Sequence, residues 1–578
     1  MKKKKSLKVF HNVFKMLKKY KLMCFFAFIC MFISAMFGIL NGYIQGELLE
    51  AIIASNIKLA VTFLGIYFVV FFIMNNMFLH IGTYLANKVE LNLSKRLSTL
   101  VYKKVLNLPA YAFEEKTTGE LINRISNDTE TLANNLEGVI DILISLLACI
   151  IIFIYIMLNS YIIGIEIIIF LILICLVMKL FDPKMKKINE NIKKINDEYA
   201  ALSTETIRGI REIKTLGIKP NLFKEATTLR EELFNREKED IKFDRFYRII
   251  MSSLKTLLEV VIYLTCVFEI SKGRVSIGFF MAMTWYVYRY TWLIESIVRM
   301  NKMYQKMFVS LRRINELIDN TLYEDETYGN IKLKNIKGNI KFDNVTFAYK
   351  GEETTLKHFT AEFQPNKKIA VVGKSGQGKS TIFNLITRIF DVEEGSIYID
   401  GVNIKDIDEV SFRKNISIIR QEPFIFNRTI LENFKIVKPN ITLKEVKKYC
   451  KMAYLDKYIE SLPKKYNTLL GEGGVNLSGG QKQRLAIARS LAKESKIILF
   501  DEATSALDNE SQVYIKKVID KLSHDHTVII IAHRLSTIVD SDIIYIIDKG
   551  KLQATGTHKE LLESSKVYSK LYKKEDEI

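Results

Sequence analysis

Residues 373–381 read Gly-Lys-Ser-Gly-Gln-Gly-Lys-Ser-Thr, and this segment is the most informative part of the second half of the chain. It matches the pattern G-x-x-x-x-G-K-[ST], in which a glycine-rich loop turns successive backbone amides toward a phosphate group. The apolar run 369–372 before it predicts a buried parallel strand, and residues 381–390 after it predict a helix whose N-terminus attracts anions. The sequence therefore predicts a polyphosphate site on an α/β domain.

The residue types in this loop suit that chemistry. Gly373, Gly376 and Gly378 allow the backbone to curl so that its amides point inward. Lys379 is expected to neutralise the β- and γ-phosphates, and the Ser380 hydroxyl to ligate a bridging Mg²⁺. A glycine-rich turn that opens an ordinary helix is the alternative, and the flanking strand and helix argue against it.

The apolar residues of the 578-residue chain are unevenly distributed. Long apolar runs fill the first half, whereas the chain from Ile331 onward has the mixed composition of a soluble α/β domain. The formal net charge of +20 is explained by lysines beside membrane spans, and no basic stripe with interleaved aromatics indicates nucleic acid as a partner. The six cysteines form no CxxC pair, so neither a disulfide framework nor a zinc site is predicted.

Six apolar runs are long enough to cross the hydrocarbon core of a bilayer, which takes about 20 residues. They cover residues 22–44, 59–79, 139–158, 161–180, 249–270 and 277–298. The connections after the second and fourth runs are rich in lysine, and the remaining short connections are not. By the positive-inside rule, the N-terminus and the phosphate loop are expected in the cytoplasm, where ATP is available.

The two cytoplasmic connections, about residues 80–138 and 181–248, are too long for simple turns. Apolar residues recur in them at helical spacing, in the first connection at Leu91, Leu97, Val101 and Val105. Breaks are predicted at four residues, Pro109, Gly119, Gly217 and Pro220. Two helical hairpins that reach out of the bilayer and dock onto another domain are therefore expected, with disordered charged loops as the alternative.

Several ionisable residues fall inside the predicted spans, where one charge costs roughly 2.5 to 3.5 kcal/mol near the bilayer centre. Such groups are expected to face protein or water. Glu166, Glu259 and Arg289 are the candidates for a substrate pathway. An internal ion pair, or an aromatic belt at the membrane interface around Arg289, is the alternative.

Further candidate sites in the second half precede or follow predicted strands. Tyr349 ends a strand-like run and is placed to stack on a base, with an ordinary surface tyrosine as the alternative. Gln421 follows the strand predicted at 416–419. Residues 477–481, Leu-Ser-Gly-Gly-Gln, open a predicted helix and offer a second N-terminus to an anion.

Two more strands lead to charged residues. The strand predicted at 496–502 ends in Asp501 and Glu502, and Asp508 follows shortly after it. The strand predicted at 528–532 ends at His533.

In this order, these motifs resemble the ATP-binding cassette (ABC) domain, and the five-residue signature beside the phosphate loop and the Asp-Glu pair is very specific. The first half resembles the six-helix transmembrane domain of ABC exporters, on the residues Leu108, Pro109, Phe113, Gly119 and Asp128. The resemblance covers essentially the whole chain. Its one departure is Gln377, where a smaller residue is commoner in the family, and whose backbone amide serves equally well.

The resemblance implies a role for each candidate residue. ATP would be bound by Tyr349, Gly373, Ser375, Gly376, Gly378, Lys379, Ser380, Thr381 and Asp501, and Mg²⁺ by Ser380, Gln421 and Asp501. Catalysis would fall to Glu502, which polarises the attacking water, with His533 and Gln421. ATP held by the opposite subunit would be bound by Leu477, Ser478, Gly479, Gly480, Gln481 and Asp508.

The fold class implied is a multi-domain membrane protein. Residues 1–320 would form an all-α, six-span transmembrane domain with long cytoplasmic helical extensions, and residues 331–578 an α/β nucleotide-binding domain with a phosphate loop. Because the chain has one cassette, a dimer is implied, a homodimer by preference and a heterodimer as the alternative. The location implied is the plasma membrane.

The function implied is export of a small amphipathic molecule, a lipid or a peptide by an ABC half-transporter that hydrolyses ATP. An importer with an exporter-like fold and an ATP-gated channel or signalling protein are the alternatives, whereas the fused spans argue against a soluble ABC ATPase. Glu166 and Glu259 would suit amphipathic cations, and drug-like amphiphiles are the preferred substrate class.

Overall fold

The chain divides into two compact units. The computed structural model describes residues 17–115, 118–320, 323–351, 353–471, 474–502, 509–531 and 538–576. The first unit comprises the described residues of Met1–Val105 and Gly119–Thr321, and the second those of Leu106–Thr118 and Leu322–Ile578. A short piece of the first long connection therefore belongs to the second unit.

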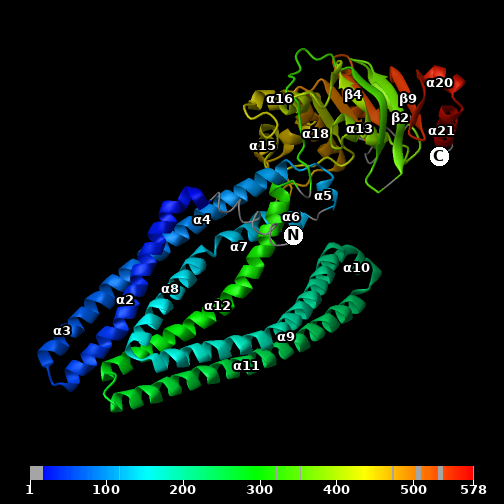
Figure 1. Cartoon of the computed structure of the whole chain (residues 1–578). Coiled ribbons are helices and arrows are strands. Elements are labelled where there is room, and N and C mark those ends of the chain that lie inside the picture. The colour runs from blue at the N-terminus through cyan, green and yellow to red at the C-terminus, as the bar shows by residue number, and fades with distance from the viewer. Residues whose placement is uncertain are drawn as a thin grey trace. The chain divides into compact units, whose positions relative to one another are not determined.

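The described residues of the first unit form helices (Figure 1). In chain order they are η1 Lys18–Tyr20, α2 Lys21–Ile53, α3 Ile57–Tyr67, η2 Phe68–Asn75, α4 Asn76–Leu106, α6 Thr118–Asn123, η3 Arg124–Asp128, α7 Thr129–Ala133, α8 Leu136–Asn159, α9 Tyr161–Arg208, α10 Ile210–Leu216, α11 Lys219–Ser271 and α12 Ile277–Ile318.

Five helical stretches among the described residues are long and apolar enough to cross a membrane. They are Lys18–Ile53, Ile57–Leu106, Gly119–Asn159, Tyr161–Arg208 and Lys219–Ser271. Each contains one of the first five expected spans. The sixth expected span, 277–298, lies in α12, which is not among the five because its membrane-length stretch is rich in Trp and Tyr and carries Arg289.

The second long connection, residues 181–248, is a helical hairpin, as predicted. Figure 1 shows α9 and α11 running side by side, joined by the short α10. Gly217 adopts a left-handed backbone with φ +69° directly after α10, and Pro220 lies in the first turn of α11. A left-handed glycine ends a helix and a proline in the first turn begins one, which explains why the chain reverses here.

The first connection is helical too, but its buried face differs from the prediction. Leu97, Val101 and Val105 of α4 are buried, whereas Leu91 is 70% exposed and Leu93 is buried in its place. Leu93 lies four residues before Leu97 and therefore shares its face of the helix, which Leu91 does not.

The second unit is an α/β domain. Its elements are α5 Ala112–Glu115, β1 Ile340–Ala348, β2 Thr354–Phe363, β3 Lys368–Val372, α13 Lys379–Ile386, β4 Glu394–Ile399, β5 Val402–Asn403, α14 Glu409–Asn415, β6 Ile416–Ile419, α15 Ile430–Lys435, α16 Leu443–Met452, α17 Asp456–Ser461, η4 Lys465–Asn467, α18 Gly479–Lys493, β7 Ile497–Asp501, α19 Asn509–Leu522, β8 Thr527–Ile531, β9 Ile543–Asp548, β10 Lys551–Gly556, α20 His558–Ser564 and α21 Lys566–Asp576.

The larger sheet of this unit has the strand order β10-β9-β3-β8-β7-β6, and β1, β2, β4 and β5 form a second, antiparallel sheet. The neighbours from β9 to β6 pair in parallel, and β10 is antiparallel to β9. The strands predicted before the phosphate loop, before Gln421, before Asp501 and before His533 are confirmed as β3, β6, β7 and β8. Their carboxyl ends therefore meet at one edge of the sheet.

Both faces of this sheet are buried. Along β3, Ala370 and Val372 pack into a core with α18 and α19, whereas Ile369 and Val371 pack into a second core with α13 and the antiparallel sheet. Burial on both faces explains why β3 is apolar throughout.

The helix after the phosphate loop is shorter than predicted. It was expected over 381–390, but α13 ends at Ile386. The chain leaves the helix because Arg388 adopts a left-handed backbone with φ +49°.

Candidate functional site

The phosphate loop connects the end of β3 to the start of α13. At Gly373, an added Cβ atom would lie 2.3 Å from the carbonyl oxygen of Ile547 on the neighbouring strand, so no larger residue fits. Gly378 precedes α13 with φ +90°, a conformation that residues with a side chain rarely adopt. The loop geometry therefore requires glycine at both positions.

The Lys379 side chain folds back over this loop. Its Nζ donates hydrogen bonds of 2.8 Å to the carbonyl oxygens of Gly373 and Lys374. Burial lowers the pKa of Lys379, and the carboxylates of Glu502 and Asp501 act in the opposite direction. The structure thus brings the ammonium and this carboxylate pair into one electrostatic environment, although they are more than a hundred residues apart in sequence.

The carboxylate pair lies at the end of β7, close to the loop. Asp501 pairs in register with Ile531 of β8, and Ile531 pairs with Val371 of β3, two residues before the loop. The Glu502 amide donates a 2.9 Å hydrogen bond to the carbonyl of Ile531. Glu502 has φ +50°, which is uncommon for a residue with a side chain, and such strain concentrates at functional sites.

Tyr349 follows β1 and is anchored to the phosphate-loop helix. Its hydroxyl lies 3.1 Å from Thr381 Oγ1 and accepts a 3.2 Å hydrogen bond from Asn384 Nδ2. Its ring packs edge to face against Phe347 and Phe390. These contacts hold an aromatic ring beside the loop.

Gln377 adds a contact that the sequence did not indicate. Its Oε1 accepts a hydrogen bond from the backbone N–H of Lys549, in the turn between β9 and β10. The residue that departs from the family pattern therefore ties the loop to the next strand connection through its side chain.

The signature segment caps α18, as predicted. Ser478 Oγ accepts a 3.3 Å hydrogen bond from the Gln481 amide, and the Ser478 amide donates one of 2.9 Å to Gln481 Oε1. This reciprocal cap fixes the start of the helix. Ser478 and Gly479 are exposed, while Leu477 and Gly480 are buried. The N-terminus of α18 is therefore presented to the surroundings of the chain.

Comparison with known proteins agrees with this geometry. Residues 24–291 match the family described as the ABC transporter transmembrane region, and residues 356–505 match the family described as ABC transporter. One relative, the ATP-dependent lipid A-core flippase of Pasteurella multocida (strain Pm70), is 32% identical over 504 residues, which cover 85% of this chain and 84% of the relative. The chain belongs to the ABC transporter family.

Two further similarities concern the transporter as a whole. The putative multidrug export ATP-binding/permease protein YgaD of Bacillus subtilis (strain 168) is 30% identical over 490 residues, 84% of each chain. The structure of a bacterial Atm1-family ABC exporter with ATP bound superposes with a TM-score of 0.82 at 24% identity, covering 96% of this chain and 98% of that one. The protein is thus a multi-pass membrane ATPase with an exporter-type fold.

The donors around the loop of this transporter suit a magnesium ion. The side chains of Ser380, Asp501 and Gln421 offer a hydroxyl, a carboxylate and an amide oxygen, which are the hard oxygen ligands that Mg²⁺ prefers, with phosphates and water completing its shell. Ser380 is exposed at the start of α13, and Gln421 lies two residues past the end of β6, beside β7. The residues present therefore fit the ion.

Gln421 also shares a hollow with the signature segment. A cavity of about 510 Å³ is lined by Gln421, Leu477, Gly479 and Gln483, among others. Of the remaining predicted site residues, His533 and Asp508 lie outside the described residues. Ser375 and Gly376 lie exposed in the loop.

Two residues that link α18 to the Gln421 segment were missed at the sequence level. Gln483 is 2% exposed, and its Nε2 donates to the carbonyls of Arg420 at 3.0 Å and Gln421 at 2.6 Å. Arg489 donates a 2.9 Å hydrogen bond to the Phe424 carbonyl. A signal was present for Gln483, because it lies one turn before the buried Ile487 and thus on the inner face of α18.

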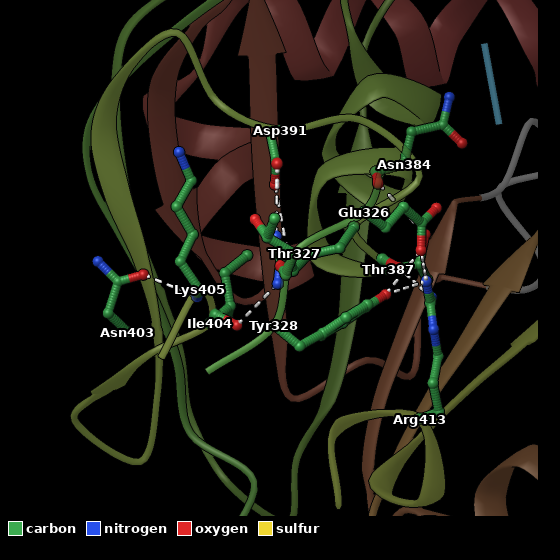
Figure 2. Close-up of polar contacts among 11 residues, drawn as sticks. Glu326, Thr327, Tyr328, Asn384, Thr387, Asp391, Asn403, Ile404, Lys405 and Arg413 are labelled. Carbon is green, nitrogen blue, oxygen red and sulfur yellow. Dashed lines mark hydrogen bonds and ion pairs between the residues drawn. The ribbon is translucent and has the colours of Figure 1, made fainter. Parts of the chain in front are cut away.

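A second group that was missed ties the chain before β1 to the end of the phosphate-loop helix. Figure 2 shows Tyr328, Glu326 and Arg413 converging. The Tyr328 ring lies 4.6 Å from the guanidinium of Arg388 and 5.7 Å from that of Arg413. Arg413 also donates a 2.6 Å hydrogen bond to the Thr387 carbonyl, directly after α13. Burial raises the pKa of Tyr328 to about 12, so it stays a neutral phenol.

The three candidate pathway residues do not form one group. Glu166 Oε1 accepts a 2.6 Å hydrogen bond from the Thr265 hydroxyl, which joins α9 to α11, and Glu259 lies half-buried on α11. Arg289 lies on α12 and lines a cavity whose lining includes neither glutamate. The glutamates and the arginine therefore belong to separate places in the first unit.

Proposed function

We propose that this ABC transporter exports a small amphipathic molecule, a lipid or a peptide by alternating access, driven by ATP hydrolysis. One observation carries the proposal: the shared edge of β3, β6 and β7 collects the phosphate loop, Gln421 and the carboxylate pair. The other unit of the same chain contains helical stretches long and apolar enough to cross a membrane. The names of the relatives, a flippase and a multidrug exporter, support outward movement.

The residues at this edge divide the chemistry among them. Lys379 already holds its ammonium between two loop carbonyls, and we propose that it transfers these hydrogen bonds to the β- and γ-phosphates of ATP. The Glu502 carboxylate, one residue past β7, polarises the attacking water. Ser380, Gln421 and Asp501 hold Mg²⁺, and His533 contacts the γ-phosphate.

We further propose that two copies of the chain complete each ATP site. Ser478 and Gly479 are exposed at the N-terminus of α18, where they can contact the γ-phosphate of an ATP bound to a second copy. The hairpin of α9, α10 and α11 also carries exposed apolar side chains, Ile207, Leu216, Phe223 and Phe234. Exposed apolar side chains on an extended hairpin suit contact with a partner chain. A homodimer supplies a partner for both the signature segment and the apolar side chains of the hairpin, and a heterodimer is the alternative.

Mixing two inactive variants tests the shared site. In a mixed dimer of Lys379→Ala and Gly479→Asp chains, one site carries both defects and the other carries neither. Up to half of the wild-type ATPase activity per mixed dimer is therefore expected, although each variant alone is inactive. Mixing Lys379→Ala with Glu502→Gln is the matched control, because each site then keeps one defect. Absence of recovery in the first mixture would contradict a site built from two copies.

Vectorial transport tests the direction. We propose that residues 1–320 form the transmembrane domain and residues 331–578 the nucleotide-binding domain. We further propose that the protein lies in the plasma membrane, with its N-terminus and its cassette in the cytoplasm. In inside-out proteoliposomes the cassette then faces the ATP-containing medium, and ATP-dependent accumulation of a labelled lipid, cationic dye or peptide is expected. Loss of preloaded substrate from these vesicles would indicate an importer. Movement only down a gradient would indicate a channel.

A further inference from the structure

The first unit contains a cavity that the ATP chemistry does not use. It has a volume of about 280 Å³ and lies among α2, η2, α4, α8 and α12. Apolar and aromatic side chains make up most of its lining, and the polar lining residues are Ser34, Asn41, Asn75, Asp141, Tyr288 and Arg289. A mostly apolar cavity with a few polar groups is typical of a ligand site, and this volume suits a headgroup rather than a whole lipid.

Arg289 brings a positive charge to the lining of this cavity. Its guanidinium carbon lies 5.5 Å from the centre of the Trp292 ring. Among the side chains that the structure describes, Arg289 has this ring contact and no hydrogen bond or ion pair. A cation inside a membrane span is costly unless a partner of opposite charge or water meets it. The cavity therefore offers a place for an anion beside Arg289.

Asn41 supplies a second, independent donor. Trp285 Nε1 can only donate, and it donates a 2.7 Å hydrogen bond to Gln45 Oε1. The amide nitrogen of Gln45 is therefore the group that faces Asn41 Oδ1, at 3.3 Å. Asn41 is left with its own Nδ2 buried and without a partner among the described residues, and the residue is 1% exposed. A buried amide donor of this kind requires an acceptor.

The two donors belong to neighbouring stretches of α2 and α12. The Tyr286 hydroxyl donates a 3.2 Å hydrogen bond to the Ile39 carbonyl, which aligns the turn before Arg289 with the turn that carries Asn41. Asp141, the carboxylate of the cavity, is engaged in an interaction of its own.

The backbone around this cavity is also irregular. Phe71 and Asn75 line it from η2, where the helix widens into π-type turns between α3 and α4. Asn75 Oδ1 accepts a 2.7 Å hydrogen bond from the Ser34 hydroxyl of α2. Such π-type turns occur frequently at functional sites.

We propose that this cavity binds the acidic group, a phosphate or a carboxylate, of an amphiphile, with Arg289 and Asn41 as its donors and the aromatic lining against its apolar part. This proposal rests on the proposed export function and names the substrate chemistry. It differs from the cationic amphiphiles that Glu166 and Glu259 suggested, because those carboxylates lie outside this cavity.

The chain provides its own probe for a test. It contains two tryptophans, Trp285 and Trp292, and both line the cavity. Full-length protein in nanodiscs of uncharged detergent-like lipid is titrated with dodecyl phosphate, dodecanoate, dodecanol, dodecyltrimethylammonium and inorganic phosphate, while tryptophan fluorescence is recorded. A saturable change is expected with the two acidic amphiphiles, and at least about tenfold weaker binding with the neutral and cationic ones, because charge-assisted hydrogen bonds are about twice as strong as neutral ones.

Three variants assign the response to the cavity. Arg289→Gln is expected to raise the Kd for dodecyl phosphate at least about tenfold, and Arg289→Lys to raise it less. Gly38→Leu is expected to abolish the response to every probe, because a side chain at Gly38 enters open space in this cavity. Arg274→Gln is the control, since Arg274 pairs with Glu269 outside the cavity.

The outcomes separate the possibilities. An equal response to dodecanol, or an unchanged Kd for dodecyl phosphate in Arg289→Gln protein, would overturn the proposal. Saturation by inorganic phosphate at the same concentration as dodecyl phosphate would show that the cavity binds a free anion. That result would overturn the proposal that the ligand is an amphiphile. Binding is measured without transport, so a failure of export leaves this test intact.

Discussion

Adding one methyl group at Gly373 tests whether the phosphate loop must lie against β9. In Gly373→Ala, the new Cβ would start 2.3 Å from the Ile547 carbonyl oxygen, and an ordinary contact begins at 3.4 Å. The loop must therefore retreat by about 1 Å, because Ile547 belongs to a strand that β3 and β10 hold on both sides. A misplacement of about 1 Å can lower a rate about 100-fold. We expect kcat/KM for ATP to fall by about that factor, or about 2.7 kcal/mol.

The assay is steady-state ATP hydrolysis together with binding of a fluorescent ATP analogue. Gly401→Ala is the matched control, since its Cβ meets nothing within 4 Å, although its φ of +82° makes the substitution strained. That strain costs about 1 to 2 kcal/mol of stability without moving the loop. Gly401→Ala should therefore hydrolyse ATP normally. Wild-type turnover by Gly373→Ala would refute the reasoning that close approach to β9 positions the loop.

The other predictions concern stability. Tyr328→Leu removes two cation–π contacts and should destabilise the second unit by about 2 kcal/mol, which lowers its Tm. An unchanged Tm would show that the contacts of Tyr328 with Arg388 and Arg413 do not hold the chain before β1. Burial lowers the pKa of Lys493 to about 8, so the folded state binds this proton less readily than the unfolded state. The free energy of unfolding should therefore rise between about pH 8 and 10.5. Lys493→Met should flatten that rise, and an equally steep pH profile in the variant would contradict the prediction. Gly46→Ala places a Cβ 2.3 Å from the Gly278 carbonyl oxygen, so it should separate α2 from α12 and lower the Tm in detergent. Gly65→Ala is the control, because open space surrounds Gly65 and its Tm should not change. Equal Tm values for the two variants would argue against close packing at Gly46.

The second unit was the more predictable of the two from the sequence. Strands such as 369–372 and 416–419 are short apolar runs that end at glycine or polar residues, and a parallel sheet buries both faces of such runs. The end of α13 was not predictable, because nothing in the sequence shows that Arg388 adopts a left-handed backbone.

The side-chain contacts were beyond the sequence for a different reason. Gln377 and Gln483 form hydrogen bonds with backbone groups of Lys549 and Gln421, which become neighbours only through the order of the strands. Likewise, charge alone grouped Glu166 with Arg289, whereas the packing of α9 on α11 and of α2 on α12 separates them. Helix pairing is set by long-range packing, which a single sequence does not display.

The most direct test of the proposed mechanism is single-turnover ATP hydrolysis by Glu502→Gln. Glu502 lies one residue past β7 and would act as the general base. The glutamine amide of the variant cannot accept the proton, so hydrolysis should slow by about 10²- to 10⁴-fold while ATP still binds and closes the dimer. Glu393→Gln, on the exposed surface, is the control and should behave as wild type. Near-normal turnover by Glu502→Gln would contradict the assignment of the base.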